Sequence, residues 1–384
     1  MNLESQTICT GCGSASLSEA LTIVDQPVIL NYRFPTPEAS ASVSRRPISL
    51  RHCRDCDLIF NAAFDPAVVP YDEHYENRQS HSEAFAKHTA RIARMITAVL
   101  ESKAPRILEL GCGKGEFLRD LVRFCSGTGE GWDTSYEGPA VADNITFFKE
   151  YLTPQAKRGS FDAIVCRHVI EHVPAIGQFL QDLADIAEGA GAPYVFLETP
   201  RLEWILEHKS AWDVFYEHCN YFSERALSKL CQRAGFKIVG HYPVFSHQYQ
   251  LLVLTKKDAV SQPAASSFEG LTQILTDSLA RLETLIDEAR NDAPWAIWGA
   301  GAKGVCLANR LENSGLGKVF DTNTAKQGFF IPGTHIPIVA PNPEDFQDLG
   351  LIVIVNPTYE TEIRKTLDAS DYSGTILTLT DDLL

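Results

Sequence analysis

The sequence is short of three features that each define a class of protein. No apolar run approaches the roughly 20 residues that a membrane-spanning helix needs, and the first residues carry no recognisable secretory signal. Basic residues are also in deficit, because 34 Lys and Arg stand against 49 Asp and Glu, a formal net charge of −15. Nucleic acids and anionic membranes attract positively charged surfaces. We therefore expect a cytoplasmic protein with neither a membrane nor a nucleic-acid partner.

Length, apolar content and cysteine are present in quantity. The 384 residues are 45 % hydrophobic, which is enough for about two or three separate domains. Ten cysteines are present, and some, such as Cys166 and Cys231, fall within apparent core segments. Scattered cysteines are typical of a reducing compartment, where clustered thiols bind metal rather than forming disulfides.

Two Cys-x-x-Cys pairs stand out in the N-terminal part of the chain. Cys9 and Cys12 form the first pair, and Cys53 and Cys56 form the second. Four thiolates can close a tetrahedral zinc site, and the metal would stabilise a module with few core residues of its own. A redox-active pair is the alternative. We predict a structural zinc-binding module over residues 1–68, separate from the chemistry.

The most informative motif follows the apolar segment at 107–110. Gly111 and Gly113 come next, and a helical pattern begins at Glu116. A strand, a glycine turn and a helix N-terminus let the backbone approach a ligand closely. Glu109 precedes the glycines, whereas a P-loop would end in Gly-Lys-Ser/Thr. An acid at this position suits a nucleoside that carries an amino-acid tail.

Two later segments occur in the order that such a fold requires. Asp133 ends the next apolar stretch, where a carboxylate can accept hydrogen bonds from both ribose hydroxyls. Phe161–Cys166 reads as a buried strand, and the loop Arg167–Pro174 follows it. Together the three segments resemble the class I S-adenosylmethionine (SAM) methyltransferases. A nicotinamide-dinucleotide fold is the alternative for the glycine motif alone.

Pattern changes along the chain predict two further boundaries. A helix is expected at 83–102, and strands and helices then alternate, as a doubly wound sheet over 69–257 requires. Residues 256–267 are rich in Ala, Ser and Pro and read as a linker. An amphipathic helix should follow, with an apolar face formed by Leu271, Ile274, Leu275, Leu279, Leu282 and Ile286.

A second α/β unit is predicted over 268–384. The strand pattern Trp295–Trp298 leads into Gly299–Gly304, which has the form GxGxxG, and Asp321 lies near the end of the next strand. Read alone, these residues match a dinucleotide-binding fingerprint. The chain therefore carries two Rossmann-like units in series.

This order of parts resembles the sugar C-methyltransferase family over nearly the whole chain. The resemblance implies an α/β fold: a doubly wound Rossmann-like class I SAM methyltransferase sheet, preceded by a small zinc-binding module and followed by a second Rossmann-like α/β domain. It implies SAM and Zn²⁺ as cofactors and a nucleotide-linked keto-deoxysugar as the small-molecule acceptor. The tail would help to hold that sugar nucleotide rather than NAD. The matching segments are Cys9, Cys12, Cys53 and Cys56, Leu108–Gly113, Phe215–His218, Gly299–Gly304, Asp321–Asn323, Pro332–Pro337 and Asn356–Tyr359.

The chain departs from that family at two places. Members often carry His-Gly-Gly where this sequence has Phe245–Gln250, and often tyrosine where it has Phe215. These departures leave the reaction class unchanged and bear on which sugar is accepted.

Methylation of a carbon beside a ketone needs a base, an enolate stabiliser and an in-line methyl donor. The family motif falls on Glu217 and His218, so His218 is the predicted base, with Glu217 orienting it or acting itself; a packed histidine is the alternative. The remaining expectations follow from position. His172 would contact a sugar oxygen. Tyr216 would donate a hydrogen bond to the enolate, and Tyr71 or Tyr75 would close over the site. The residues expected to contact SAM are Glu109, Gly111, Gly113, Asp133 and His168. A diphosphate would need nearby cations such as Arg201, Lys209, Lys303 and Lys326.

Three other functions stay open at this stage. The same scaffold can methylate oxygen or nitrogen of a different small molecule. A non-catalytic protein can retain SAM binding for regulation. An NAD(P)-dependent oxidoreductase would use Gly299–Gly304. Solvent deuterium in the substrate carbon, the effect of replacing His218, and NAD(H) binding separate these possibilities.

Overall fold

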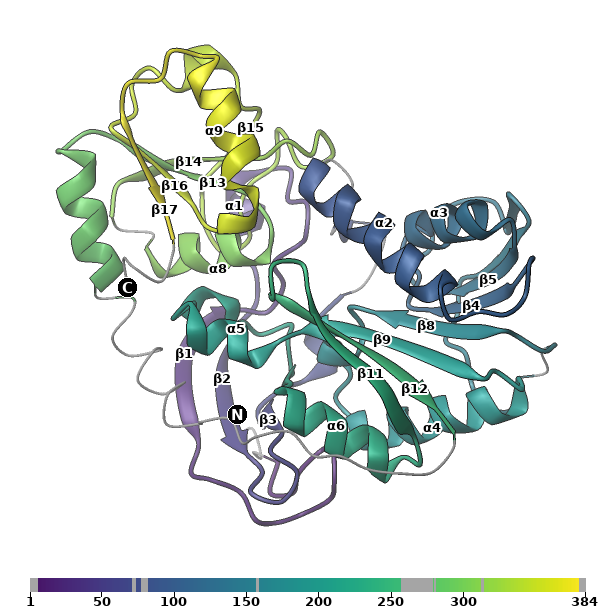
Figure 1. The fold of residues 1–384 in the computed structure, drawn as a ribbon. Coiled ribbons are helices and arrows are strands. Elements are labelled where there is room, and N and C mark those ends of the chain that lie inside the picture. The colour runs from purple at the N-terminus through teal and green to yellow at the C-terminus, as the bar shows by residue number, and fades with distance from the viewer. Residues whose placement is uncertain are drawn as a thin grey trace.

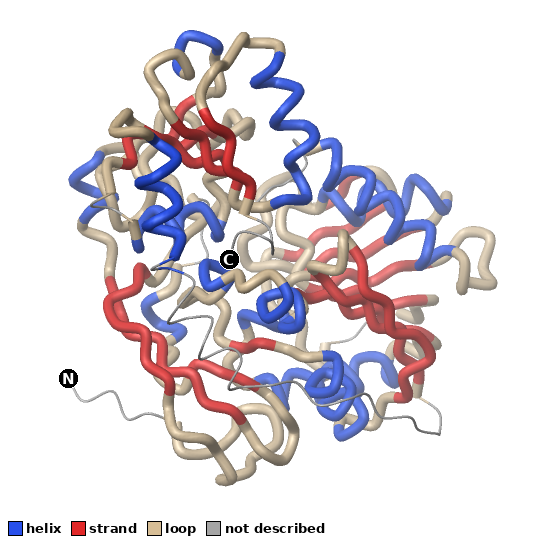
Figure 2. The backbone as a smooth tube through the Cα atoms, turned by 60° about the vertical axis from the view of Figure 1, so that its left-hand side comes forward, coloured by secondary structure: helices blue, strands red, loops and turns tan. Residues whose placement is uncertain are grey.

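The computed structural model describes residues 6–70, 74–76, 82–156, 159–256, 279, 281–311 and 314–379. Three β-sheets occupy separate parts of the molecule (Figures 1 and 2). The predictions for Tyr71, Leu271, Ile274, Leu275 and most of the linker lie outside the described residues. Among the helices that are described, none is long and apolar enough to cross a membrane.

The N-terminal sheet is antiparallel and has four strands. Its order is β1-β2-β3-β10, so its last strand comes from a segment far along the chain. The strands are β1 (Leu21–Pro27), β2 (Arg45–His52), β3 (Ile59–Asn61) and β10 (Asn220–Tyr221), with the short helix α1 (Pro37–Ala41) between β1 and β2. The N-terminal part and the middle of the chain therefore share a sheet.

The middle sheet has eight strands in the order β11-β12-β9-β8-β4-β5-β7-β6. Five of them, β9, β8, β4, β5 and β7, run parallel, and β12 pairs antiparallel with β9. Their bounds are β4 (Arg106–Leu110), β5 (Thr128–Trp132), β6 (Val141–Ala142), β7 (Ile145–Phe148), β8 (Ala163–Arg167), β9 (Tyr194–Pro200), β11 (Lys237–Val244) and β12 (Tyr249–Thr255). This is the doubly wound sheet that the sequence predicts.

Helices cover both faces of this sheet, because successive strand side chains point to opposite faces. Ile107 and Val165 pack with α2 (Glu83–Thr97) and α3 (Glu116–Cys125). Leu108 and Ile164 pack on the other face with α4 (Ile176–Gly189) and α6 (Glu224–Arg233). The helix predicted over 83–102 ends earlier than expected, at Thr97, and Ala98 is its C-cap. The short helix α5 (Leu202–Glu207) follows β9.

The C-terminal sheet is parallel and has five strands in the order β15-β14-β13-β16-β17. Residues 281–290 are helical, and Leu282 and Ile286 are fully buried, as the amphipathic pattern predicts. The other elements are β13 (Trp295–Trp298), α8 (Ala302–Arg310), β14 (Leu316–Phe320), β15 (Ile338–Val339), β16 (Leu351–Ile354), α9 (Glu360–Asp368) and β17 (Thr375–Thr378). A second Rossmann-like unit is therefore present.

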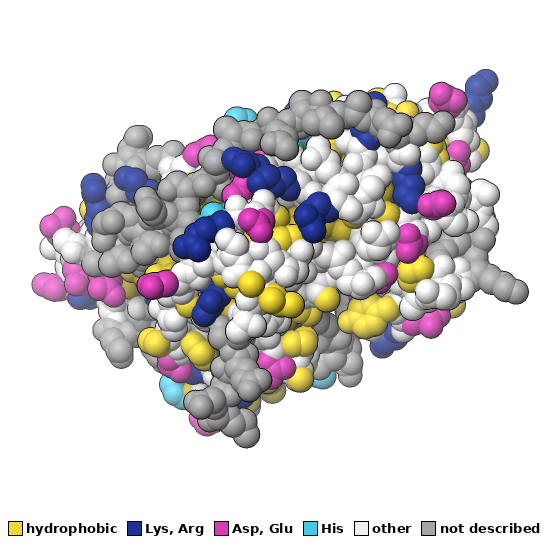
Figure 3. Space-filling view, turned by 90° about the horizontal axis from the view of Figure 1, so that it is seen from below, with side chains coloured by type: hydrophobic (Ala, Val, Ile, Leu, Met, Phe, Trp, Pro, Cys, Tyr) yellow, Lys and Arg dark blue, Asp and Glu magenta, His cyan; other side chains and the backbone are white. Residues whose placement is uncertain are grey.

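The C-terminal unit packs on the rest of the chain through a continuous core. Leu30, Trp212 and Phe215 join its buried cluster, and the Arg310 guanidinium donates to the carbonyl oxygens of Ala211 and Val214 at 2.8 Å each. On the face seen in Figure 3, described Lys and Arg side chains stand among Asp and Glu. The buried cluster and the Arg310 hydrogen bonds hold the C-terminal sheet against the middle of the chain. A cavity lies between these two parts.

Candidate active site

A cavity of about 1120 Å³ runs between the middle and C-terminal units. One end is formed by the glycine turn after β4 and by the loop after β5. The central part is formed by the loops after β8 and before β10, and the other end by the turn after β13. The cavity thus lies at the carboxyl ends of the parallel strands, where α/β folds bind ligands.

The glycine turn keeps one end of this cavity open. Gly111 and Gly113 have φ of 70° and 54°, a left-handed conformation that favours glycine. The Gly113 N–H donates to Asp133 Oδ2 at 2.8 Å, and a Cβ at Gly113 would have no neighbour within 4 Å. The turn therefore leaves space for a ligand against the backbone.

Glu109 lies beneath this turn and is only 3 % exposed. Its Oε2 atom is buried without a hydrogen-bond partner, and burial raises the pKa of its carboxyl to about 8. A buried carboxylate in this position is complemented by a cationic group. With the open glycine turn and Asp133 beside it, the described residues fit a nucleoside with a cationic amino-acid tail, as SAM has.

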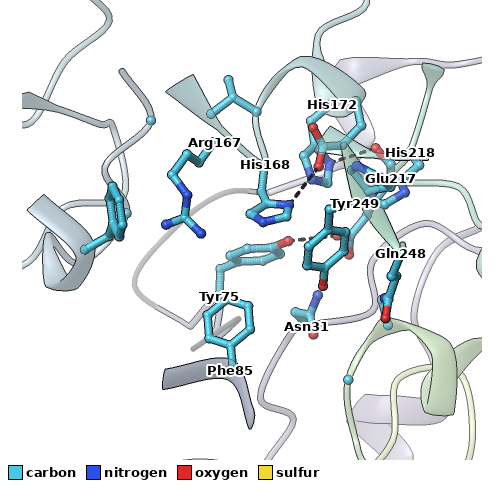
Figure 4. Close-up of a pocket in the computed structure, with 18 of the residues that line it drawn as sticks. Asn31, Tyr75, Phe85, Arg167, His168, His172, Glu217, His218, Gln248 and Tyr249 are labelled. Atoms are coloured by element: carbon cyan, nitrogen blue, oxygen red, sulfur yellow. Dashed lines mark hydrogen bonds and ion pairs between the residues drawn. The ribbon is translucent and has the colours of Figure 1, made fainter. Parts of the chain in front are cut away.

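A buried ionic network adjoins the glycine turn. Glu198, in the second half of β9, accepts from Arg167 Nε and His88 Nε2, each at 2.6 Å, and lies 3.6 Å from His168 Nε2. His168 Nδ1 is also 3.6 Å from Glu171, so two carboxylates outweigh burial and raise the pKa of His168 to about 9. In Figure 4, His168 lies between Arg167 and the pair His172 and His218.

The acceptor end is built around Glu217, which is fully buried. Its carboxylate accepts a hydrogen bond from Tyr75 Oη at 2.9 Å and another from the Leu30 N–H, and burial raises its pKa. The Glu217 carbonyl accepts a hydrogen bond from His172 Nδ1 at 2.9 Å, which fixes the orientation of the ring.

His218 stands against this group. Its ring centre is 4.8 Å from that of His172 and 4.1 Å from that of Phe215. Burial, reinforced by the neighbouring His172, holds the pKa of His218 well below its usual value. A neutral imidazole with a free lone pair is the form that can take a proton. The same imidazoles, with Glu171, bring three ligand atoms within 4.8 Å of one another, so this point of the cavity is also rich in metal-binding groups.

The structure brings together nine of the ten predicted cofactor and catalytic residues. Those that line the cavity are Tyr75, Glu109, Gly111, Gly113, Asp133, His168, His172, Glu217 and His218. Tyr216 is the correction: its hydroxyl accepts from the Asp65 N–H at 2.9 Å, in the N-terminal unit, and the side chain does not line the cavity. The chain turns at Tyr216 and Glu217, and the turn directs the Tyr216 ring into the buried cluster of the N-terminal sheet while Glu217 faces the cavity.

The ionic network contains functional candidates that the sequence reasoning missed. Arg167 is the last residue of β8 and Glu171 lies in the loop that follows, but Glu198 and His88 lie on other elements. The one available signal was Glu198 itself, the charged residue of the buried strand β9.

The four predicted zinc ligands also meet. Their sulfur atoms all lie within 4.8 Å of one another, with 3.5 Å between Cys9 and Cys56 and between Cys12 and Cys53. Sulfur atoms around a tetrahedral zinc ion are about 3.8 Å apart for Zn–S bonds of about 2.3 Å. The four thiols are not paired as disulfides, and the cluster is away from the cavity. Its donors and spacing fit Zn²⁺.

Comparisons with known proteins agree with this geometry. Residues 75–241 match a methyltransferase domain, and residues 254–379 match the C-methyltransferase C-terminal domain. The C-methyltransferase NovU of Streptomyces niveus is 23 % identical over 369 residues, which are 87 % of this chain and 85 % of that protein.

Solved structures are similar to part of the chain. The magnesium protoporphyrin IX methyltransferase of Synechocystis PCC 6803, with bound SAH, has 17 % identity and a TM-score of 0.35, over 45 % of this chain and 84 % of that one. An S-adenosylmethionine-dependent methyltransferase from Mesorhizobium loti has 15 % identity and a TM-score of 0.35, over 45 % and 99 %. From its two matched domains and its fold, the chain is a SAM-dependent methyltransferase that carries the C-terminal domain of the C-methyltransferases.

Proposed function

We propose that this enzyme methylates a carbon next to a ketone in a nucleotide-linked keto-deoxysugar, through an enolate formed by His218 or Glu217. One observation carries the proposal: the neutral imidazole of His218 and the buried carboxyl of Glu217 line the same cavity as the glycine turn at Gly111–Gly113. A base and a methyl donor can therefore reach one acceptor.

The chemistry follows from these positions. SAM, when bound, supplies the electrophilic methyl group. The His218 imidazole removes the proton next to the acceptor's ketone, which breaks a C–H bond and leaves an enolate. SAM would supply the methyl group to that enolate carbon, and the proton taken from it would remain on the His218 imidazole. Tyr75 stands 2.9 Å from Glu217 and can turn its hydroxyl toward the enolate oxygen.

Glu217 serves this step in one of two ways. Ionised, it stabilises the imidazolium that His218 becomes; because burial raises its pKa, it is also a stronger base than an exposed carboxylate. The Leu30 N–H and Tyr75 hydroxyl hold its carboxylate, while its carbonyl holds His172. One residue therefore orients both sides of the acceptor pocket.

The far end of the cavity supports a nucleotide diphosphate. The turn at Gly299–Gly304 begins α8, whose first turn has no side-chain cap, and backbone N–H groups at such a terminus bind phosphate. Lys303 lies there, paired with Asp213 at 2.9 Å. Lys326 donates to the Ala300 carbonyl at 2.9 Å, and Arg201 pairs with Glu224 at 3.1 Å. A bound diphosphate would replace Asp213 as the ion-pair partner of Lys303. Lys209 does not line the cavity.

A second candidate function is O- or N-methylation of a small molecule without phosphate. The described cavity lining contains 12 Asp and Glu against 5 Lys and Arg, an excess that disfavours an anionic acceptor. This reading keeps the SAM site and changes the acceptor.

The deciding experiment supplies labelled SAM and a panel of nucleotide 4-keto-6-deoxysugars in heavy water, with product analysis by mass spectrometry and NMR. A new methyl group on carbon, with wash-in of deuterium at that carbon when SAM is omitted, would support the enolate mechanism. His218→Ala should lose both signals. Methyl transfer to oxygen or nitrogen would assign the second function, and no transfer to any member would reject a sugar nucleotide.

A further inference from the structure

The turn between β11 and β12 has an unusual backbone. Phe245, Ser246 and His247 have φ of 49°, 52° and 70°, and nowhere else in the described chain do three successive non-glycine residues share this left-handed conformation. The Gln248 N–H donates to the Phe245 carbonyl at 3.0 Å, so Ser246 and His247 are the central residues of a hydrogen-bonded turn. Positive φ at both central positions is typical of type I′ turns, which favour Gly, Asn and Asp there. Ser246 and His247 therefore adopt it at a cost in backbone strain.

Contacts from other parts of the chain hold the turn in this conformation. Phe245 is buried, and its ring centre lies 4.8 Å from that of His88 on α2 and 5.9 Å from that of Tyr359 in the C-terminal unit. The Gln248 carbonyl accepts from the Arg201 N–H at 3.0 Å. Strained backbone persists only where the surrounding structure fixes it, and it is found most often at functional sites. The position of Gln248 is therefore fixed from several sides.

Gln248 is the residue of this turn that reaches the cavity. It is 6 % exposed and lines the cavity, as does Asn356 of the C-terminal unit. In Figure 4, Gln248 lies on the same side of the view as Glu217 and His218, away from Arg167. The turn thus places one uncharged polar side chain in the acceptor part of the cavity.

The hydrogen bonds of Asn356 determine which atom of the Gln248 amide is left for a ligand. Asn356 Oδ1 accepts from the Thr358 N–H at 3.1 Å, so Nδ2 is the atom directed at Gln248. Asn356 Nδ2 donates to Gln248 Oε1 at 3.0 Å. Gln248 Nε2 has no acceptor among the described residues, so its two hydrogens are available to a molecule in the cavity.

We propose that Gln248 Nε2 donates a hydrogen bond to a ring hydroxyl of the acceptor, and that this bond helps to select the sugar that is methylated. The inference rests on the proposed sugar acceptor, in which Tyr75 serves the ketone oxygen and leaves the hydroxyls for other donors. A buried donor rejects an analogue that lacks the matching oxygen, because the donor is then left unpaired. Asn356 is a positioning residue, since it sets which amide atom faces the ligand.

The chain offers a matched control in Gln250, two residues further along. Its Nε2 donates to the carbonyl oxygens of Pro200 and Phe222 at 3.3 and 2.9 Å, and its Oε1 lies 2.9 Å from His241 Nε2. Gln250 is fully buried and does not line the cavity. An effect that depends only on losing a buried amide should appear at both glutamines.

The test is titration calorimetry with S-adenosylhomocysteine bound, which prevents methyl transfer. The ligands are a nucleotide 4-keto-6-deoxyhexose, its 2-deoxy and 3-deoxy analogues, and the nucleoside diphosphate alone. The wild-type enzyme should bind one of the two analogues about 3- to 30-fold more weakly than the parent, as expected for a lost hydrogen bond. Gln248→Met should bind the parent more weakly by the same factor, and should bind that analogue and the nucleoside diphosphate as the wild type does.

The outcomes separate this inference from the proposed function. If the wild type binds the sugar nucleotide and Gln248→Met binds it equally well, the role of Gln248 is overturned and the sugar acceptor stands. An equal loss for the parent and both analogues in Gln248→Met would show a structural role only. If no sugar nucleotide binds to the wild type, the acceptor class is rejected and this inference with it.

Further variants test the amide itself. Asn356→Asp replaces the donor by a carboxylate, so the Gln248 amide must turn Nε2 toward it and present Oε1 to the cavity. This variant should bind the parent and the discriminated analogue with equal affinity, whatever the added charge does to both, and wild-type discrimination would overturn the positioning role. Gln250→Met should lower Tm and keep the wild-type discrimination. If Gln248→Met does not fold, Gln248→Glu provides the measurement, because it still accepts from Asn356 but cannot donate.

Discussion

In both the middle and the C-terminal unit, an aspartate carboxylate holds the glycine turn by hydrogen bonds, but the surroundings of the two turns differ. In the middle unit, Asp133 Oδ2 accepts from the Gly113 N–H at 2.8 Å and Oδ1 from the Ser135 N–H at 2.7 Å. In the C-terminal unit, Asp321 Oδ2 accepts from the Ala300 N–H at 2.8 Å and Oδ1 from the Asn323 N–H at 2.7 Å. An aspartate after the second strand thus locks the turn after the first strand in both.

The two turns differ in what surrounds them. Two residues before its first glycine, the middle unit has Glu109, with an unpartnered oxygen, whereas the C-terminal unit has the fully buried Ile297. The C-terminal turn is also tied down by Lys326, which donates to the Ala300 carbonyl at 2.9 Å. A glycine-rich turn therefore specifies a backbone shape, and the charges beside it decide whether a nucleoside with a charged tail can bind.

The largest effect should come from the acceptor side of the middle unit. His218→Ala should lower kcat by about 10²- to 10⁴-fold, the usual cost of losing a general base, with SAM affinity nearly unchanged. Lys303→Ala in the C-terminal unit is the contrast: it should raise KM for a sugar nucleotide more than it lowers kcat. Steady-state kinetics separate the two. A His218→Ala enzyme with full kcat would place the base elsewhere.

A pair of glycine substitutions should separate the two turns directly. Gly111→Ala forces a left-handed residue and puts a Cβ 2.1 Å from Val169 Cγ2, so SAM affinity should fall by about 10- to 100-fold. Gly301→Ala meets no atom within 4 Å and has an ordinary φ of −83°, so SAM affinity should stay within about twofold. Titration calorimetry measures both, and equal losses would mean that the turns act together.

The cysteine cluster should affect the middle unit more than the C-terminal one. Cys9, Cys53 and Cys56 belong to the same buried cluster as the apolar faces of α4 and α6. Cys53→Ser should therefore lose bound zinc and lower Tm by roughly 5–10 °C. Cys125→Ser, outside the cluster, is the control. Elemental analysis that finds no zinc in the wild-type protein would contradict the assignment.

The smallest effect is a pH dependence confined to the middle unit. His168, with its pKa raised from 6.5 to about 9, stabilises the fold fully below about pH 6.5, and this contribution is lost as pH rises through 9. Denaturant unfolding of His168→Gln should show a free energy of unfolding that changes less between pH 6.5 and 9. The exposed His335→Gln, in the C-terminal unit, should keep the wild-type slope. If the free energy of unfolding changed with pH to the same extent in all three proteins, the ion pairs of His168 would not stabilise the fold.

The sequence predicted what lies within contiguous motifs. The two glycine turns, Asp133 and the parallel strands could be read because each depends on neighbours along the chain. The link between His88 and Glu198 could not, because it joins residues 110 positions apart on a helix and a strand. Tyr216 was placed wrongly because the motif gives the order of residues and not the side to which each one points.

The position of β10 has a consequence for how this enzyme can change. Glu217 and His218 lie two to three residues before this strand, which completes the N-terminal sheet by pairing with β3, and the Leu30 N–H donates to Glu217. The acceptor pocket is thus shared between two stretches of gene. A recombinant of two related enzymes with its crossover near residue 69 would take the Leu30 N–H from one parent and the Glu217 carboxylate from the other. Acceptor range should therefore be inherited with the N-terminal stretch and the 215–221 segment as one block.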